Sequence, residues 1–270
     1  MKIPPIHLDY DTNFQPKQPT FRNIPAHYQE RFSDLLRFLW EQGVITDIDP
    51  RKSYDCVMNV VITDKAQGQI RMNIDNTPRN PGLKRTKFHV QTPQEIRHEL
   101  KEAKIFTEMD MGWAYHQVPI DEETRETMIF QTHEGLYRME RLYFGPTALS
   151  GLFYNEVRKK FLWLNRVTNE RDNILVYSSD EATLLKDLES ALARCLESGI
   201  TLNLSKSTFA ISMIRWIGRT LTSNRVTADM GKVEGLIQEG HQRDIEEVLS
   251  LLIACQSNAK FAFDNGNLGS

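Results

Sequence analysis

The sequence predicts an α+β protein with a largely antiparallel sheet. Segments with apolar residues at helical spacing are mixed with short β-branched runs, and the two kinds do not alternate strictly as they would in a doubly wound fold. Several strand-like runs come in neighbouring pairs joined by short polar turns, as antiparallel hairpins do. The chain has 270 residues, 40% hydrophobic and 26% charged, enough for one large domain or two to three packed subdomains.

The first half of the chain opens with an extended arm at 1–26. Five of the eleven prolines lie in this arm, and proline lacks the amide hydrogen that helices and central strands use. Further along, apolar residues recur at the spacings typical of helices and strands. These patterns predict a helix at 26–43, a hairpin at 56–75 with its turn at 66–69, a helix at 92–103, and a strand at 104–111 followed by a turn at Gly112 and a short extended piece.

The second half continues with the same mixture. Ser178 and Glu181 have the spacing of a capping box, in which two side chains satisfy backbone amides at the start of a helix. This helix should end at Gly199 and bury the face that holds Leu184, Leu185, Leu188, Leu192 and Leu196. The other predicted elements are a hairpin at 127–144 with its turn at Glu134 and Gly135, a helix from Thr147 or Ser150 to Leu164, strands at 174–178, 201–204, 208–212 and 214–222, a turn at 223–224, and helices at 229–239 and 244–256.

Composition narrows the classes of function. The net charge of −3 means that any nucleic-acid role must depend on local basic patches, such as 84–87 and 158–160, although either could be an ordinary solvated surface. The cysteines Cys56, Cys195 and Cys255 form no Cys-x-x-Cys pair, which disfavours a zinc site and suits a reducing compartment. The sequence has no apolar run of bilayer length and no signal-peptide core. We therefore expect an intracellular protein, cytoplasmic or nuclear, without membrane association.

Two aspartates are candidate metal ligands. Asp110 ends an apolar strand, and Asp172 lies at a turn just before another strand. Magnesium prefers hard oxygen ligands and usually takes one or two carboxylates together with substrate phosphates. Two such ions can hold the attacking and leaving oxygens of a phosphoryl transfer. Because aspartate is also a common turn former, the pattern alone leaves a purely structural role open.

The residues around both aspartates resemble the reverse transcriptases of Ty3/gypsy-type long-terminal-repeat retrotransposons. The resemblance runs collinearly from about Pro16 to Phe263. Its most specific parts are "IFTEMDMGWAYHQVPIDEETRETMIFQTHEGLYRMERLYFG", around Asp110, and "NERDNILVYSSDEATLLKDLESALARCLESGITLNLSKSTF", around Asp172. It implies a right-hand polymerase with fingers and palm at 27–230, the start of a thumb at 231–264 and a polar tail at 265–270.

The resemblance also implies roles for single residues. Asp110 and Asp172 would be the metal carboxylates, Lys206 would protonate the leaving pyrophosphate, and Tyr115 would lie under the nucleotide sugar and exclude a 2′-hydroxyl. The other matched positions are Lys65 and Arg71 for the triphosphate, Phe144 and Gly145 at the nucleotide pocket, and Trp216, Ile217 and Gly218 in the primer grip. The hairpin residues could equally serve packing, and Tyr115 could be a core aromatic.

Several positions depart from the family pattern. Asn173 stands where the family has a second consecutive aspartate, and an amide oxygen can accept a hydrogen bond but carries no charge. Glu170 replaces an apolar residue, so we expect it to be exposed or paired with Arg171 or Arg166. Further departures are Thr77 in place of an arginine and the run "FGPTALSG" at 144–151.

These departures shape the expected function. The resemblance implies templated addition of deoxynucleotides to a primer 3′-hydroxyl, with RNA or DNA as template, a primer–template duplex and a dNTP as partners, and two Mg²⁺ or Mn²⁺ ions as cofactors. Loss of one preorganised electrostatic group costs on the order of 10²–10³ in rate, so Asn173 is expected to impair or abolish polymerisation. The alternatives are a non-catalytic module that binds nucleic acid or a partner, and a translated relic.

Overall fold

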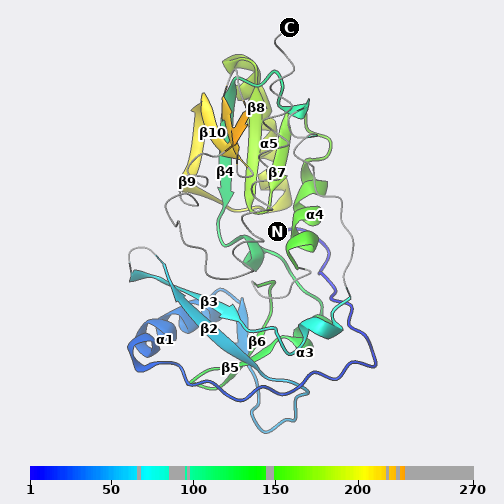
Figure 1. Ribbon diagram of the computed structural model, residues 1–270, viewed down its shortest axis with the longest axis vertical. Helices are drawn as coiled ribbons and strands as arrows, with labels where there is room; N and C mark the ends of the chain where they lie inside the picture. The colour runs from blue at the N-terminus through cyan, green and yellow to red at the C-terminus, as the bar shows by residue number, and fades with distance from the viewer. Residues whose placement is uncertain are drawn as a thin grey trace, which may run out of the picture.

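The computed structural model describes residues 1–65, 68–84, 95, 98–143, 149–216, 219–222 and 226–228. These residues form two lobes, one above the other in Figure 1. We call them the α1 lobe and the α5 lobe after their main helices. The turn expected at 223–224, the helices expected at 229–239 and 244–256, and most of the helix expected at 92–103 lie outside the described residues.

The α1 lobe is a five-stranded sheet with one long helix. Its strands lie in the order β1-β6-β5-β2-β3, and every pair is antiparallel except β2 with β5. Helix α1 packs Phe32, Leu36 and Leu39 inward, a spacing of four and three that keeps them on one face. The elements are α1 (Ala26–Glu41), β1 (Ile45–Asp47), β2 (Met58–Asp64), β3 (Ile70–Ile74), the short 3₁₀ helix η2 (Asn80–Gly82), α3 (Glu122–Thr127), β5 (Ile129–Gln131) and β6 (Leu136–Met139).

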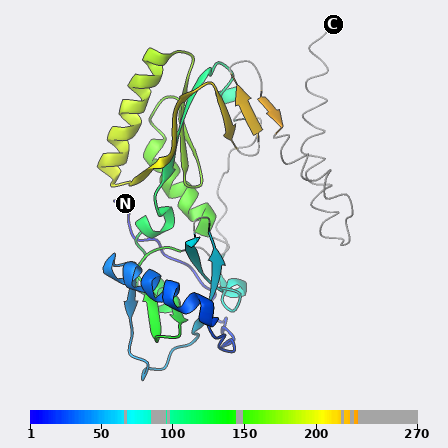
Figure 2. The same ribbon diagram turned by 90° about the vertical axis from the view of Figure 1, so that its left-hand side faces the viewer.

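The α5 lobe is built on a four-stranded antiparallel sheet in the order β7-β8-β4-β9. Helices α4 and α5 pack against this sheet, and Figure 2 shows α5 lying along its side. A second, three-stranded antiparallel sheet follows in the order β10-β11-β12. The elements are β4 (Ile105–Met111), the 3₁₀ helix η3 (Ala114–Gln117), α4 (Leu149–Phe161), β7 (Val167–Glu170), β8 (Asn173–Ser178), α5 (Glu181–Ser198), β9 (Leu202–Ile211), β10 (Met213–Trp216), β11 (Arg219–Thr222) and β12 (Val226–Ala228).

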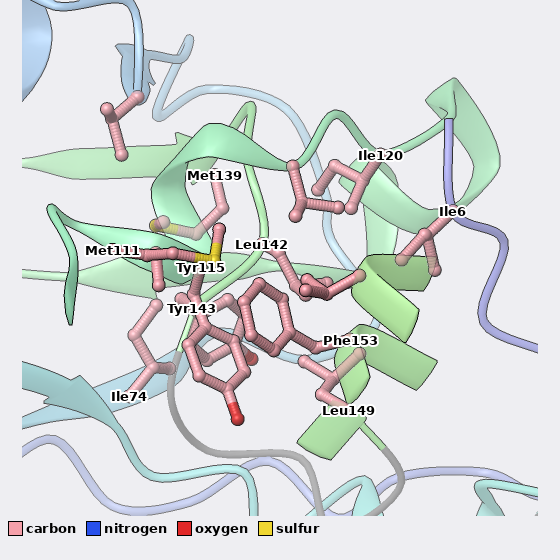
Figure 3. Packing of buried hydrophobic residues seen from close by; sticks show 14 of the residues in the cluster. Ile6, Ile74, Met111, Tyr115, Ile120, Met139, Leu142, Tyr143, Leu149 and Phe153 are labelled. Atoms are coloured by element: carbon pink, nitrogen blue, oxygen red, sulfur yellow. The ribbon is translucent and has the colours of Figure 1, made fainter. Parts of the chain in front are cut away.

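Alternation along the strands separates two cores. One face of the sheet joins a large cluster that includes Ile174, Val176 and Phe153 together with Phe32 and Phe130 of the α1 lobe. The other face joins a smaller cluster made by Leu100, Ala103, Phe106, Leu175, Tyr177, Ile214, Trp216 and Leu221. Figure 3 shows part of the large cluster, with Tyr115, Tyr143 and Phe153 gathered near Met111 and Met139. Because the large cluster contains side chains from both lobes, the two lobes share a hydrophobic core.

The N-terminal arm is the dark blue segment in Figure 1, which starts between the lobes and passes around the α1 lobe. Ile6 and Leu8 are buried, and Ile6 forms a parallel bridge with Ile120. The Met1 ammonium donates to the carbonyl oxygen of Gln117 at 2.8 Å. The predicted extended conformation is therefore observed, and buried side chains anchor the arm instead of leaving it loose on the surface.

Most predicted elements are found, but several details were wrong. A 3₁₀ helix, η3, follows Gly112 in place of the extended piece, and Asp180, not Ser178, caps α5 by accepting from the Thr183 amide. The segments 201–204 and 208–212 form one strand, β9, whereas 214–222 is split into β10 and β11. Strands β1, β7 and β12 and helices α3 and η2 were not predicted; all are short, and β1 depends on its distant partner β6.

The buried face of α5 also differs from the prediction. Leu184 is buried as expected, but the rest of the buried face consists of Asp187, Ala191, Cys195 and Ser198. Leu185, Leu192 and Leu196 are exposed. Among the described residues, no helix has the length and apolar character needed to cross a bilayer.

Candidate active site

Strand β4 and the β7–β8 hairpin bring the two predicted carboxylates together. Asp110 lies opposite Asn173 in the antiparallel register of β4 and β8. Asp172 occupies the two-residue turn between β7 and β8, and its carbonyl oxygen accepts from the Met111 amide at 2.8 Å. Directly opposed residues share a face of a sheet. Asp110 and Asn173 therefore share a face, beside the turn that carries Asp172.

The turn before Asp172 has an unusual backbone. Arg171 has a φ of 50°, in the left-handed region that non-glycine residues seldom adopt. Its guanidinium Nε lies 3.7 Å from Glu170 Oε1, and Glu170 is partly buried. The expectation that Glu170 would pair with Arg171 is thus met. Arg166 instead forms two hydrogen bonds to Asp187, at 2.6 and 3.0 Å.

A wide bulge in β9 carries Lys206. Asp110 pairs with Asn203 and Glu108 with Thr208, so the single β4 residue between them faces the four β9 residues 204–207. The Ser207 hydroxyl accepts from the Asp110 amide at 3.1 Å and donates to the Asn203 carbonyl oxygen at 2.8 Å. This bond fixes the bulge to β4 beside the aspartate.

The α1 lobe contributes two positively charged side chains near the aspartates and Lys206. Lys65 follows β2, and Arg71 lies on β3, where the β2–β3 hairpin is closed by a bond from the Lys65 amide to the Gln69 carbonyl oxygen at 2.7 Å. A pocket of about 340 Å³ is lined by both cations and by Asp110, Asp172 and Lys206. Five predicted site residues from five separate segments therefore meet at one pocket.

The charges in this pocket influence one another. Burial raises the pKa of the Asp110 carboxyl above its usual value, with Lys206 opposing the rise and Asp172 adding to it. Burial lowers the pKa of Lys65, and the neighbouring charges of Arg71 and Lys206 lower it further. The pocket thus combines a crowded anionic side with a crowded cationic side, and each is better stabilised by a ligand of the opposite charge.

The pocket offers two carboxylates as ligands for a divalent cation. Across the described ranges, no group of three or more His, Cys, Asp or Glu side chains is arranged to hold a metal ion. Asp110 and Asp172 offer two carboxylates at the pocket. A magnesium ion bound by one or two carboxylates completes its shell with water and substrate phosphates, so two carboxylates fit that mode.

The remaining predicted residues lie elsewhere or outside the described part of the chain. Tyr115 is only 7% exposed, and its ring stacks on Phe153 with centroids 4.7 Å apart. Figure 3 shows these two rings side by side. Trp216 is buried in the smaller core cluster. Phe144, Gly145, Ile217 and Gly218 lie outside the described residues.

Three residues near the pocket were not singled out from the sequence. Glu108 precedes Asp110 by two residues on β4, so alternation places both on one face, and this spacing was a usable signal. His116 and Trp113 line the pocket with the predicted residues. Burial, with Lys65 nearby, lowers the pKa of His116 to about 4, so it is neutral near pH 7. No local spacing pointed to Trp113 or His116.

A family model described as reverse transcriptase (RNA-dependent DNA polymerase) matches residues 57–221, more than half of the chain. The chain belongs to the reverse transcriptase family. The match spans β2 to β11, so it covers both pocket-forming hairpins and the bulge of β9. It confirms the resemblance drawn from the motifs around Asp110 and Asp172.

Relatives of this reverse transcriptase chain include transposon polyproteins. The retrovirus-related Pol polyprotein from transposon 412 of Drosophila melanogaster is 25% identical over 203 residues, covering 71% of this chain and 16% of that polyprotein. The transposon Tf2-7 polyprotein of Schizosaccharomyces pombe is 21% identical over 209 residues, covering 75% of this chain and 15% of that polyprotein. The chain thus spans about a sixth of the length of these relatives.

Solved structures support the reverse transcriptase fold. The foamy viral protease-reverse transcriptase in complex with dsDNA has a TM-score of 0.79 at 19% identity, covering 93% of this chain and 52% of that one. The same viral enzyme in complex with an RNA/DNA hybrid has a TM-score of 0.78 at 19% identity, covering 93% of this chain and 33% of that one. The predicted α+β polymerase fold is therefore confirmed.

Proposed function

We propose that this reverse transcriptase chain binds the triphosphate of a dNTP in the pocket described above, beside one or two divalent cations held by Asp110 and Asp172. The observation that carries the proposal is the pocket itself. Two carboxylates from the α5 lobe and two cations from the α1 lobe line it, together with Lys206. A triphosphate with Mg²⁺ or Mn²⁺ matches this charge arrangement. The metal ions bind carboxylate oxygens, while the phosphates attract the Lys and Arg side chains.

The residues of the chain would divide the work. Arg71 and Lys65 would grip phosphate oxygens, the guanidinium through its planar fork of donors. Lys206, on the β9 bulge, would give a proton to the leaving pyrophosphate. The cations, when bound, would supply charge stabilisation for the attacking and leaving oxygens. Tyr115 would lie under the nucleotide sugar, with its ring held against Phe153.

The nucleic-acid partner would be a primer–template duplex. The matched viral structures are described as complexes with dsDNA and with an RNA/DNA hybrid, which supports this partner. The primer grip would use Trp216, Ile217 and Gly218, and the nucleotide pocket Phe144 and Gly145. We divide the chain into the arm 1–26, fingers and palm 27–230, a partial thumb 231–264 and a polar tail, acting in the cytoplasm or nucleus.

We further propose that polymerisation is weak because of Asn173. This residue faces Asp110 across the sheet and brings an amide where the family has a carboxylate. One negative charge fewer at this position weakens the hold on a divalent cation. The second candidate is a binding module without catalysis, because the positively charged side chains of the pocket do not depend on Asn173.

Primer extension on an RNA template with Mg²⁺ tests this proposal. The wild type should extend poorly, and Asn173→Asp should raise the rate by on the order of 10²–10³. Asn173→Ser is the matched control, since it changes the side chain without adding charge. Asp110→Ala in the Asn173→Asp background should abolish the gain. Vigorous extension by the wild type that Asp110→Ala removes would contradict the proposed impairment.

Binding experiments separate the second candidate. A labelled primer–template should bind the wild type in a salt-dependent manner. Binding without extension, even in Asn173→Asp, would favour the binding module. Absence of binding at low salt would reject both candidates.

A further inference from the structure

Trp113 lies at the boundary between the lobes, in the segment that joins β4 to η3. Its backbone has a φ of 51°, and the residue is 52% exposed. The left-handed backbone of a non-glycine residue carries an energetic cost. Contacts of the Trp113 side chain offset part of this cost.

The indole of Trp113 contacts residues of both lobes. The Lys65 ammonium lies 5.5 Å from the ring centroid, and the Phe38 ring of α1 lies 5.4 Å away at a tilt of 43°. The His116 ring stacks on it at 5.5 Å and 27°. Phe38 and Lys65 come from the α1 lobe, whereas His116 belongs to η3, directly after β4. The ring thus connects the β2–β3 hairpin and α1 to the segment beside the aspartates.

The hairpin needs such a connection when no anion is present. Lys65, Arg71 and Lys206 line one pocket, and their like charges repel. This repulsion, which Asp110 and Asp172 offset in part, favours movement of the hairpin away from Lys206. A cation over an aromatic ring is attracted to it without needing a neighbouring anion. Contact with Trp113 therefore opposes the repulsion at Lys65 itself.

We propose that Trp113 is a latch that holds the β2–β3 hairpin against the α5 lobe and positions Lys65 at the pocket before any phosphate ligand binds. Trp113 is a positioning residue in this scheme. The latch is a property of the fold, whereas its benefit for phosphate binding rests on the function proposed above. Because the ring already contacts Lys65, Phe38 and His116, a latch is favoured over a surface for stacking a nucleobase.

Hydrogen exchange of the hairpin tests the latch without any ligand. Trp113→Ala should make the amides of 58–65 and 68–74 exchange about two- to fivefold faster, the change expected from loss of an exposed cation–π contact. Trp113→Phe should give a smaller increase because it keeps a ring. Trp40→Ala is the matched control: Trp40 is also about half exposed, at 53%, but its indole donates to Asp47 and lies outside the pocket lining. Unchanged exchange in Trp113→Ala would overturn the latch.

If Trp113→Ala fails to fold, a double-mutant cycle of Trp113→Phe and Lys65→Met still tests the proposal. Lys65→Met removes the cation and keeps the length of the side chain. Because the ring at position 113 still contacts Phe38 and His116, Trp113→Phe should still speed hairpin exchange in the Lys65→Met background, but by a smaller factor than in the wild type. Additive effects of the two changes would mean that Lys65 and Trp113 act independently, and would also overturn the proposal.

Binding of inorganic tripolyphosphate with Mg²⁺, measured by calorimetry, tests the consequence for the ligand. If the latch positions Lys65, Trp113→Ala should weaken binding about two- to fivefold, and should have a smaller effect in the Lys65→Met background. Failure of the wild type to bind tripolyphosphate would contradict the proposed nucleotide pocket but not the latch. The latch is tested separately by hydrogen exchange. Faster exchange with unchanged tripolyphosphate affinity would overturn the positioning role of Trp113.

Discussion

Asn173 lies among carboxylates. In the register of the sheet it faces Asp110 on β4 and Glu170 on β7, and it follows Asp172 in the chain. Alternation adds Glu108 to the same face. An aspartate at position 173 would bring a further negative charge into this group. The asparagine therefore lowers repulsion in the absence of a cation, at the expense of cation binding.

Glu108 offers a test of this crowding through pH. Burial raises its pKa above the usual value, and Asp110 and Asp172 raise it further. A carboxyl whose pKa is raised by folding favours the folded state when protonated, and this contribution is lost as pH rises through the folded pKa. Glu108→Gln should therefore raise the free energy of unfolding more at about pH 7 than at about pH 4, where both states are largely protonated.

Urea unfolding at the two pH values measures this difference. Glu102→Gln is the control, because Glu102 is exposed on the same stretch of chain. An equal effect of Glu108→Gln at both pH values would show that the ionised carboxylate of Glu108 does not destabilise the folded state.

Five residues that line the pocket could be named from the sequence because they belong to short motifs. Asp110, Asp172, Lys65, Arg71 and Lys206 each lie in such a segment, and all five line the pocket. Trp113 could not be found in this way, since its partners Phe38 and Lys65 are distant in sequence. Its contribution depends on how the two lobes meet, which no local pattern encodes.

At the level of single elements, α5 shows why amphipathic patterns can mislead. Its apolar residues cover a broad arc, because the exposed leucines and the buried residues Leu184, Ala191 and Cys195 lie side by side around the helix. The sheet covers only one part of this arc. The sequence predicts that the helix is amphipathic, but the tertiary contact decides which half is buried.

Neighbouring leucines of α5 should therefore respond differently to truncation. Leu184 is 2% exposed, and Leu184→Ala should lower the free energy of unfolding by about 2–5 kcal/mol. Leu185 is 66% exposed, and Leu185→Ala should change it by less than about 0.5 kcal/mol. Chemical denaturation of the two variants gives the comparison. Similar losses for both would mean that the helix is rotated from the orientation described.

At the level of the whole molecule, the two lobes depend on one hydrophobic core. Phe32 and Phe130 of the α1 lobe belong to the same cluster as Phe153 and Ile174 of the α5 lobe. The N-terminal arm adds Ile6 and Leu8 to this cluster. Residues that share a core lose their packing together, so we expect the lobes to unfold together.

Differential scanning calorimetry tests this coupling. The two lobes should unfold in a single main transition. Phe130→Ala and Ile174→Ala should both lower the midpoint of that transition. Two separate transitions, each moved by only one of these substitutions, would show that the lobes are independent.

The overall arrangement was the hardest part to predict. The hairpin β2–β3 pairs residues close in sequence, and it was predicted correctly. The parallel pairing of β2 with β5, and the pairing of β1 with β6, join segments that are distant in sequence. Such pairings depend on side-chain packing across the whole lobe and leave no short-range signal.

The bulge of β9 has a consequence for how the protein behaves in concentrated solution. Among the described residues, β9 is an edge strand of its sheet, and Leu204 and Phe209 are exposed along it. A long regular edge with apolar side chains invites pairing with a strand of another molecule. Four residues that leave the ladder, with a lysine among them, interrupt that edge. The feature that brings Lys206 to the pocket thus also protects the sheet against edge-to-edge aggregation.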